Sequence, residues 1–148
     1  MNAAPWPRFG EKVDKIDYIV REGVYAVIVD DKRVAAIRGS SGYFLPGGGA
    51  EGNEEAEETL IREFAEECNA SIELLSLIGR ATDFLFSSSE HCHFEKRGTF
   101  YLARFLSEPD EHVLWIPFQD APGLFRQRGH VWAIQQGIER SGSKEDLH

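Results

Sequence analysis

The residues with the clearest capacity for chemistry are acidic, and they lie in one stretch from Leu45 to Ala70. This stretch holds one base, Arg62, and eight glutamates, in a chain whose formal net charge is −9. The glutamates are Glu51, Glu54, Glu55, Glu57, Glu58, Glu63, Glu66 and Glu67. Like charges three and four positions apart repel each other on a helix surface. Hard divalent cations prefer carboxylate oxygens, so the stretch is predicted to bind such cations.

Helical spacing would gather three of these carboxylates on one side. At about 100° per residue, Glu63, Glu66 and Glu67 fall within one arc of roughly 100°. A second arc of similar width is apolar and would pack against a core. Its members are Leu60, Ile61, Phe64 and Cys68. Glu57 projects near the apolar arc, so either the first turn is irregular or the helix begins late.

The predicted helix follows a loop rich in glycine, Pro46-Gly47-Gly48-Gly49. Glycine lets the backbone turn tightly, and a carbonyl of this loop, at Gly48, is a candidate metal ligand. A tight turn with no role in binding is the alternative interpretation.

The loop and helix together resemble the Nudix box, G-x5-E-x7-R-E-U-x-E-E-x-G-U, where U is apolar. The matching residues are Gly48, Glu54, Arg62, Glu63, Phe64, Glu66 and Glu67. Where the family has glycine and an apolar residue, this chain has Asn69 and Ala70. Asparagine is the next-best residue for ending a helix in the left-handed conformation, so we expect a slightly weakened C-cap.

The resemblance to the Nudix hydrolases implies hydrolysis of a diphosphate bond in a nucleoside diphosphate linked to a group X. It implies that Glu63, Glu66 and Glu67 bind Mg²⁺ or Mn²⁺, with general base as an alternative role for Glu63. Glu54 would orient the site by pairing with Arg62. Such a reaction depends on positioning and charge neutralisation and needs no covalent catalysis.

Substrate contacts have no comparable motif. The candidates for stacking on a base are Tyr43, Phe84, Phe86 and Phe94, although aromatic residues at alternating positions usually belong to a core. The candidates for holding phosphate are Arg38, Arg80 and Arg97, which could also be merely exposed. Some family members take a further acid from a later loop. The candidates here are Glu108 and Glu111, together with Asp110, Glu90 and Glu95.

A residue 16 to 18 positions beyond the box partly distinguishes the family's subclasses. Proline there indicates ADP-sugars and tyrosine indicates dinucleoside polyphosphates, whereas this chain has Phe86-Ser87-Ser88. The favoured substrate is therefore a nucleoside triphosphate, as for MutT-like enzymes, with the other two as alternatives. A nucleotide-sensing module without turnover is a further alternative, although such modules typically lose box carboxylates. An acidic protein-interaction domain would make the box spacing a coincidence.

Length and composition set the context. The chain has 148 residues, 42% of them hydrophobic and 28% charged, which suits one domain over residues 1–148 with an N-terminal arm (1–15) and a polar tail (141–148). No apolar run of signal-peptide or membrane-spanning type occurs and two cysteines make no disulfide framework, so a cytoplasmic location without membrane binding is expected. The acidic balance argues against stable nucleic-acid binding. A small nucleotide substrate is expected, and a homodimer is compatible with these features.

The remaining chain predicts an α/β fold, a mixed sheet with helices on both faces, in agreement with the α/β/α sandwich that the resemblance implies. Strands are expected at residues 16–20, 24–29, 33–38, 43–45, 98–106 and 113–117, and a second helix at 130–140. Residues 71–86 are expected to form one or two strands broken near Gly79. The polar stretch 87–93, which contains His91-Cys92-His93, is expected to be a loop and not a zinc site.

Overall fold

The computed structural model describes residues 6–145, so part of the expected arm (1–5) and of the tail (146–148) lies outside the described residues. The strands are β1 (Arg8–Phe9), β2 (Tyr18–Val27), β3 (Val29–Asp30), β4 (Arg33–Gly39), β5 (Gly42–Phe44), β6 (Gly47–Gly48), β7 (Ile72–Ser87), β8 (Cys92–Phe105) and β9 (Leu114–Pro117). The helices are α1 (Ala56–Cys68), the 3₁₀ turn η1 (Phe118–Asp120), α2 (Ala121–Leu124) and α3 (Arg128–Glu145). Within residues 6–145, no helix has both the length and the apolar character needed to cross a bilayer.

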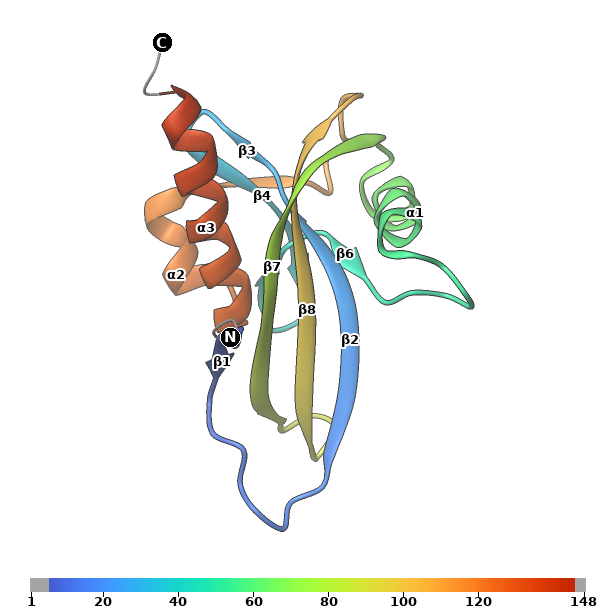
Figure 1. Ribbon diagram of the computed structural model, residues 1–148, viewed down its shortest axis with the longest axis vertical. Coiled ribbons are helices and arrows are strands. Elements are labelled where there is room, and N and C mark those ends of the chain that lie inside the picture. The colour runs from blue at the N-terminus through green and yellow to red at the C-terminus, as the bar shows by residue number, and fades with distance from the viewer. Residues whose placement is uncertain (1–5, 146–148) are drawn as a thin grey trace, which may run out of the picture.

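Two sheets form the centre of the molecule. The larger has the order β1-β7-β8-β2-β6, and its β2 and β8 run parallel to each other while β7 and β8 form an antiparallel hairpin. The smaller contains β3, β4 and β5, with β9 paired to β4. Helix α1 lies on one side of the sheets, and α2 and α3 lie on the other (Figure 1). This arrangement confirms the prediction of a mixed sheet between helices.

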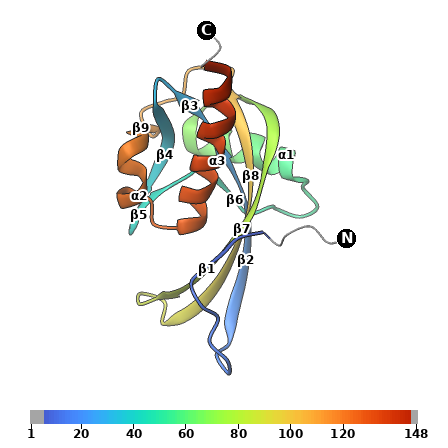
Figure 2. The same ribbon diagram turned by 60° about the vertical axis from the view of Figure 1, so that its left-hand side comes forward.

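The strands of the larger sheet are longer than the sequence indicates. β2 is one strand of ten residues where two shorter ones were expected, because it pairs with β8 from Tyr18 to Val27. This pairing overrides the weak strand propensity of Glu22 and Gly23. β7 passes through Gly79 without a break, and irregular pairing between Leu77 and Gly79 takes up the distortion. The ends of β2, β7 and β8 therefore extend beyond the helices (Figure 2).

Two further differences concern the ends of elements. β8 begins at Cys92, so His93 belongs to a strand and packs against the rings of Tyr18 and Phe86 (centroids 5.4 and 4.8 Å apart), whereas a loop was expected. α3 reaches Glu145, further than the expected helix.

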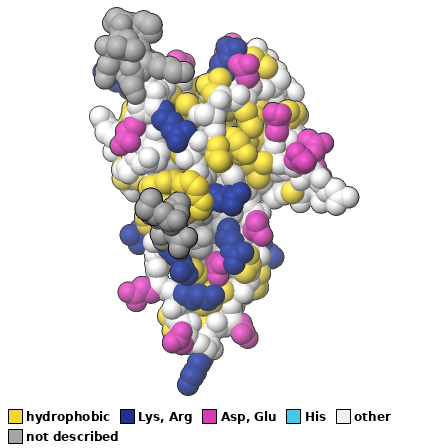
Figure 3. All heavy atoms as spheres, in the orientation of Figure 1, with side chains coloured by type: hydrophobic (Ala, Val, Ile, Leu, Met, Phe, Trp, Pro, Cys, Tyr) yellow, Lys and Arg dark blue, Asp and Glu magenta, His cyan; other side chains and the backbone are white. Residues whose placement is uncertain are grey.

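Each face of the sheets has its own apolar core. Val27, Phe100 and Ile134 belong to the core between the larger sheet and α3. Leu60, Phe64, Cys68 and Ala26 belong to the core under α1. On the face shown in Figure 3, Lys and Arg side chains gather over the middle and lower part, and acidic side chains appear near α1. The two helical layers thus enclose the sheets and leave α1 with an acidic outer side.

Candidate active site

Helix α1 begins late, which places Glu57 in an exposed first turn. The helix starts at Ala56, and the Glu58 carboxylate accepts a hydrogen bond from the backbone N–H of Glu55 at 3.0 Å. It ends at Asn69, which adopts the expected left-handed C-cap with φ 50° and ψ 44°. The apolar arc is narrower than predicted, because Ile61 is 48% exposed.

Arg62 is the centre of the polar network on α1. Its guanidinium donates two hydrogen bonds to the Glu54 carboxylate, from Nε at 2.7 Å and from Nη2 at 3.0 Å. Nη1 donates to Glu66 at 2.8 Å and to Glu63 at 3.1 Å, and Nη2 also donates to the carbonyl of Gly49 at 2.9 Å. The hydrogen bonds from Arg62 are the main reason that the pKa of Glu54 falls to about 2. Arg62 therefore ties the glycine loop, Glu54 and two acids of α1 into one unit.

Glu67 contacts the glycine loop directly. Its carboxylate accepts a hydrogen bond from the backbone N–H of Gly47 at 3.0 Å. Burial, and then the nearby charges of Glu63 and Glu66, raise the pKa of Glu67 to about 7. The Glu63 carboxylate lies against Gly48, where an added Cβ would be 2.6 Å from its Oε1. Glu63 and Glu67 are thus both held at the loop, beside each other.

The carboxylates of α1 are chemically suited to bind a hard divalent cation. Carboxylates at Glu63, Glu66 and Glu67 offer the oxygen ligands that Mg²⁺ and Mn²⁺ prefer. The pKa of Glu67 is raised first by burial and then by the charges of Glu63 and Glu66. Within residues 6–145, however, no three acidic, His or Cys side chains are grouped closely enough to hold a metal ion. Glu66 instead turns toward Arg62.

The position of the loop depends on Gly47. Gly47 has φ +146° and pairs with Tyr25 of β2, and an added Cβ would lie 2.1 Å from the carbonyl oxygen of Val24. Gly47→Ala is therefore expected to lower the free energy of unfolding by at least about 2 kcal/mol.

Chemical denaturation of this variant would test the expectation, with Gly123→Ala as control. A Cβ at Gly123 meets nothing within 4 Å, so its effect should stay within about 1 kcal/mol. Equal unfolding free energies for the two variants would contradict the assigned role of Gly47.

A buried histidine holds the segment that enters the loop. His130 of α3 is 1% exposed, and its Nδ1 accepts a hydrogen bond from the backbone N–H of Leu45 at 3.1 Å. The rings of Tyr25 and Phe100 lie 4.5 and 5.4 Å from its own. Burial lowers the pKa of His130 to about 3, so the imidazole is neutral. Sequence reasoning missed this residue, because nothing local links it to Leu45.

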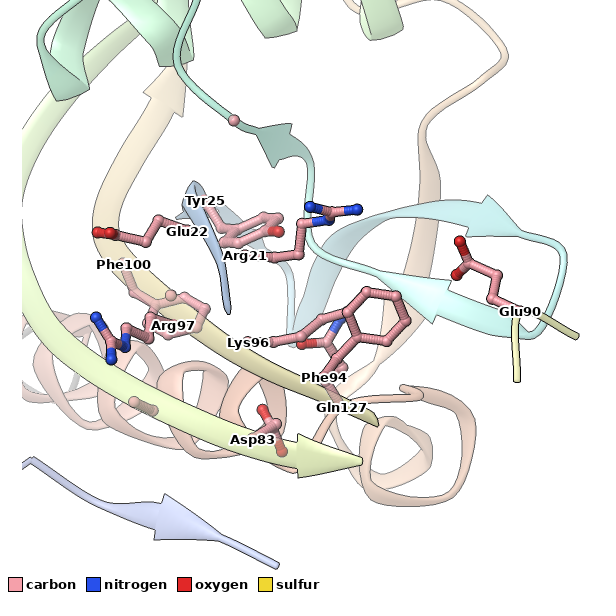
Figure 4. A pocket seen from close by; sticks show the side chains of 13 residues that line it. Arg21, Glu22, Tyr25, Asp83, Glu90, Phe94, Lys96, Arg97, Phe100 and Gln127 are labelled. Atoms are coloured by element: carbon pink, nitrogen blue, oxygen red, sulfur yellow. The ribbon is translucent and has the colours of Figure 1, made fainter. Parts of the chain in front are cut away.

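Beside the loop lies a cavity of about 280 Å³ between β2, β8 and β7. Tyr25 and Gly49 line its end near the loop, and Phe94, Lys96 and Gln127 line it further away (Figure 4). Gly98 of β8 and Ala81 of β7 are register partners that line the cavity, and their small size leaves space for it between the strands and the larger side chains. Its further lining residues include Arg21, Asp83 and Glu90. Of these, only Glu90 was a candidate from the sequence, because pairing between distant strands brings the others together.

Of the predicted substrate contacts, Phe94 and Arg97 line this cavity, and the others lie elsewhere. Arg38 is exposed on β4, and its register partner Tyr43 is half-buried and packs on the core under α3. Phe84 is buried, with the Arg8 guanidinium 4.8 Å and the Tyr18 ring 5.7 Å from its own ring. None of Arg38, Tyr43 and Phe84 is among the described residues that line the cavity.

The additional acid candidates are dispersed. Glu108 and Asp110 line a separate hollow of about 630 Å³ beside Trp115. Glu111 is exposed, and Glu95 forms ion pairs with Arg97 and Lys12 at 2.6 and 3.3 Å. The structure brings Glu54, Arg62, Glu63, Glu66 and Glu67 together at the loop. Of the later acids it brings only Glu90 to the neighbouring cavity.

Comparison with known proteins supports the interpretation of this loop and helix. The NUDIX domain model matches residues 20–136. The fold is similar to a MutT NUDIX hydrolase from Burkholderia pseudomallei (25% identity, TM-score 0.62, 80% of this chain and 98% of that chain). It is also similar to a UDP-X diphosphatase (17% identity, TM-score 0.63, 86% of this chain and 66% of that chain). A third similar structure is an ADP-ribose pyrophosphatase from Streptococcus suis 89-1591 (17% identity, TM-score 0.60, 82% of this chain and 91% of that chain). No curated protein matches the chain by sequence.

The fold and the matched segment are those of a NUDIX hydrolase. The chain belongs to the NUDIX domain family, whose model covers most of its length. The predicted resemblance to the Nudix hydrolases is thereby confirmed.

Proposed function

We propose that this protein hydrolyses a diphosphate bond in a nucleoside diphosphate linked to a group X, with Mg²⁺ or Mn²⁺ as cofactor. The observation that carries the proposal is the unit built around Arg62, which fixes Glu54, Glu63 and Glu66 beside the loop that Glu67 contacts. The cavity begins at that loop, at Gly49 and Tyr25. A diphosphate at α1 could therefore extend its linked group into the cavity.

Each residue of the unit has its own role in the proposal. Glu63, Glu66 and Glu67 hold the cation, which when bound neutralises phosphate charge and activates water. Glu54 stays ionised and holds the Arg62 guanidinium in place. Glu67 also holds the loop through Gly47. Glu63 could serve as general base, since it lies against Gly48 and beside Glu67.

A nucleoside triphosphate is the substrate favoured by the sequence, because the markers of the other subclasses are absent. The names of two similar structures, a UDP-X diphosphatase and an ADP-ribose pyrophosphatase, support the wider class of nucleoside diphosphates linked to X. The proposal covers the bond that these substrates share.

A substrate panel tests this function. The protein would be incubated with canonical and oxidised nucleoside triphosphates, ADP-ribose, a UDP-sugar and diadenosine polyphosphates, with Mg²⁺, Mn²⁺ or chelator. We expect metal-dependent release of pyrophosphate or of nucleoside monophosphate from at least one compound. Tight binding of one compound without turnover of any would favour the nucleotide-sensing alternative.

A further inference from the structure

Two cationic side chains lie over one aromatic ring of the cavity. Arg21 of β2 and Lys96 of β8 are register partners on neighbouring strands. The Arg21 guanidinium carbon lies 5.5 Å from the centre of the Phe94 ring, and Lys96 Nζ lies 5.2 Å from it. The three side chains line the same cavity (Figure 4). Their arrangement concentrates two positive charges at one place.

Neither cation of this pair is held in an ion pair by another described residue. Within residues 6–145, neither Arg21 nor Lys96 forms an ion pair. In contrast, Arg97 pairs with Glu95, and Arg104 pairs with Glu73. Like charges directly opposite on neighbouring strands destabilise a sheet. An anion that entered the cavity would offset this repulsion.

The described acids that share the cavity form no ion pair with either cation, although the positive charge of Lys96 acts on Asp83. Both oxygens of the Asp83 carboxylate accept a hydrogen bond from the backbone N–H of Gly129, Oδ2 at 2.9 Å and Oδ1 at 3.2 Å. Glu22 and Glu90 also line the cavity, but neither is ion-paired with Arg21 or Lys96. Among the described residues, both cations are therefore without an ion pair and can bind an anionic ligand.

Their position relative to the loop indicates which part of a ligand they would meet. Tyr25 pairs with Gly47 of the loop, and Arg21 precedes Tyr25 by four residues on the same strand. At about 3.3 Å per residue, this separation is roughly 13 Å. A nucleoside spans about this length, so an anionic group on the far side of a sugar from the diphosphate suits the position of the cations.

We propose that Arg21 and Lys96 bind a phosphate monoester that the substrate carries in addition to its diphosphate, so that this enzyme prefers diphosphates that bear such a group on a sugar. This inference rests on the function proposed above and narrows its substrate class. A phosphate monoester carries close to two negative charges at neutral pH, which matches two cations. Arg and Lys both form strong, charge-assisted hydrogen bonds to phosphate oxygens.

Two pairs of compounds that each differ by one phosphate test the inference. They are coenzyme A with dephospho-coenzyme A, and NADPH with NADH, assayed with Mg²⁺ for kcat/KM. We expect the wild-type protein to prefer the phosphorylated member of a pair by at least about tenfold. Arg21→Gln and Lys96→Gln should each reduce this preference by about tenfold, and Lys96→Arg should retain most of it.

Arg104→Gln is the matched control, since it removes one positive charge from β8 outside the cavity. It should leave the preference unchanged. Melting temperatures of all variants would show that they are folded. A wild-type ratio near one, or an unchanged ratio in Arg21→Gln, would overturn the inference while the proposed function stands.

Two further measurements, a binding assay and a competition assay, distinguish the remaining outcomes. If neither member of a pair is hydrolysed, the Kd of each member is measured by isothermal titration calorimetry for the same variants. The ratio of the two Kd values then replaces the ratio of kcat/KM. Failure of the whole substrate panel would overturn the function separately. Inorganic phosphate is added as a competitor, because it offers the same chemistry from another source. Inhibition by phosphate that Arg21→Gln relieves, without any preference between paired compounds, would assign the cations to free phosphate and overturn the inference.

Discussion

Glu67→Gln is expected to reduce metal-dependent turnover by at least about 100-fold while the fold stays intact. Even residues that only orient metal ligands typically contribute 10- to 100-fold, and Glu67 is proposed as a ligand. Glutamine keeps an oxygen that can accept the hydrogen bond of Gly47, which Glu67 accepts at 3.0 Å. It also removes one charge from a crowded helix, so the melting temperature should not fall. Glu66→Gln should act in the same direction.

The matched control is Glu57→Gln, which removes one charge from the exposed first turn of the same helix. Turnover would be measured against Mg²⁺ and Mn²⁺ concentration for both variants, so that weaker metal binding is separated from slower chemistry. Equal kinetics in Glu67→Gln, Glu57→Gln and the wild-type protein would contradict the assignment of Glu67.

Acid should destabilise the protein strongly through His130. Burial holds the pKa of this imidazole near 3 in the folded protein, whereas a histidine in the unfolded chain titrates near 6.5. Between these values the unfolded state binds more protons, so the free energy of unfolding falls as the pH falls. The loss is about 1.4 kcal/mol for each pH unit below about 6. The positive charge of Lys96 acts in the same direction, and Tyr25, whose pKa is raised to about 12, stays neutral.

Urea denaturation at several pH values between 4 and 7 tests this expectation. His130→Asn removes the titrating group and is expected to be less stable than wild type at pH 7. Its unfolding free energy should nevertheless fall less steeply as the pH falls. The difference in slope should correspond to about one proton, which is about 1.4 kcal/mol per pH unit. His91→Asn is the control, because His91 is exposed and asparagine tolerates its left-handed φ of 53°. Equal slopes for wild type and His130→Asn would show that another group controls the acid sensitivity.

The sequence predicted best what depends on neighbouring residues. Helix α1, its C-cap at Asn69 and the pairing of Glu54 with Arg62 follow from spacing within one segment. The cavity could not be predicted in this way, because it depends on which strands pair and in which register. Arg21 and Lys96 become neighbours only through the parallel pairing of β2 with β8. Phe84 was a reasonable candidate by residue type, but only the structure shows that it packs against Arg8 and Tyr18.

The first turn of α3 carries two neighbouring residues that bind different parts of the molecule. The Gly129 N–H donates to Asp83 of β7, and His130 accepts from Leu45 at the entrance to the glycine loop. Unwinding of that single turn would release both partners at once. The amide protons of Leu45 and Gly129 should therefore exchange with solvent deuterium as one cooperative unit, and loosening of this turn would disorder the loop before the sheet itself unfolds.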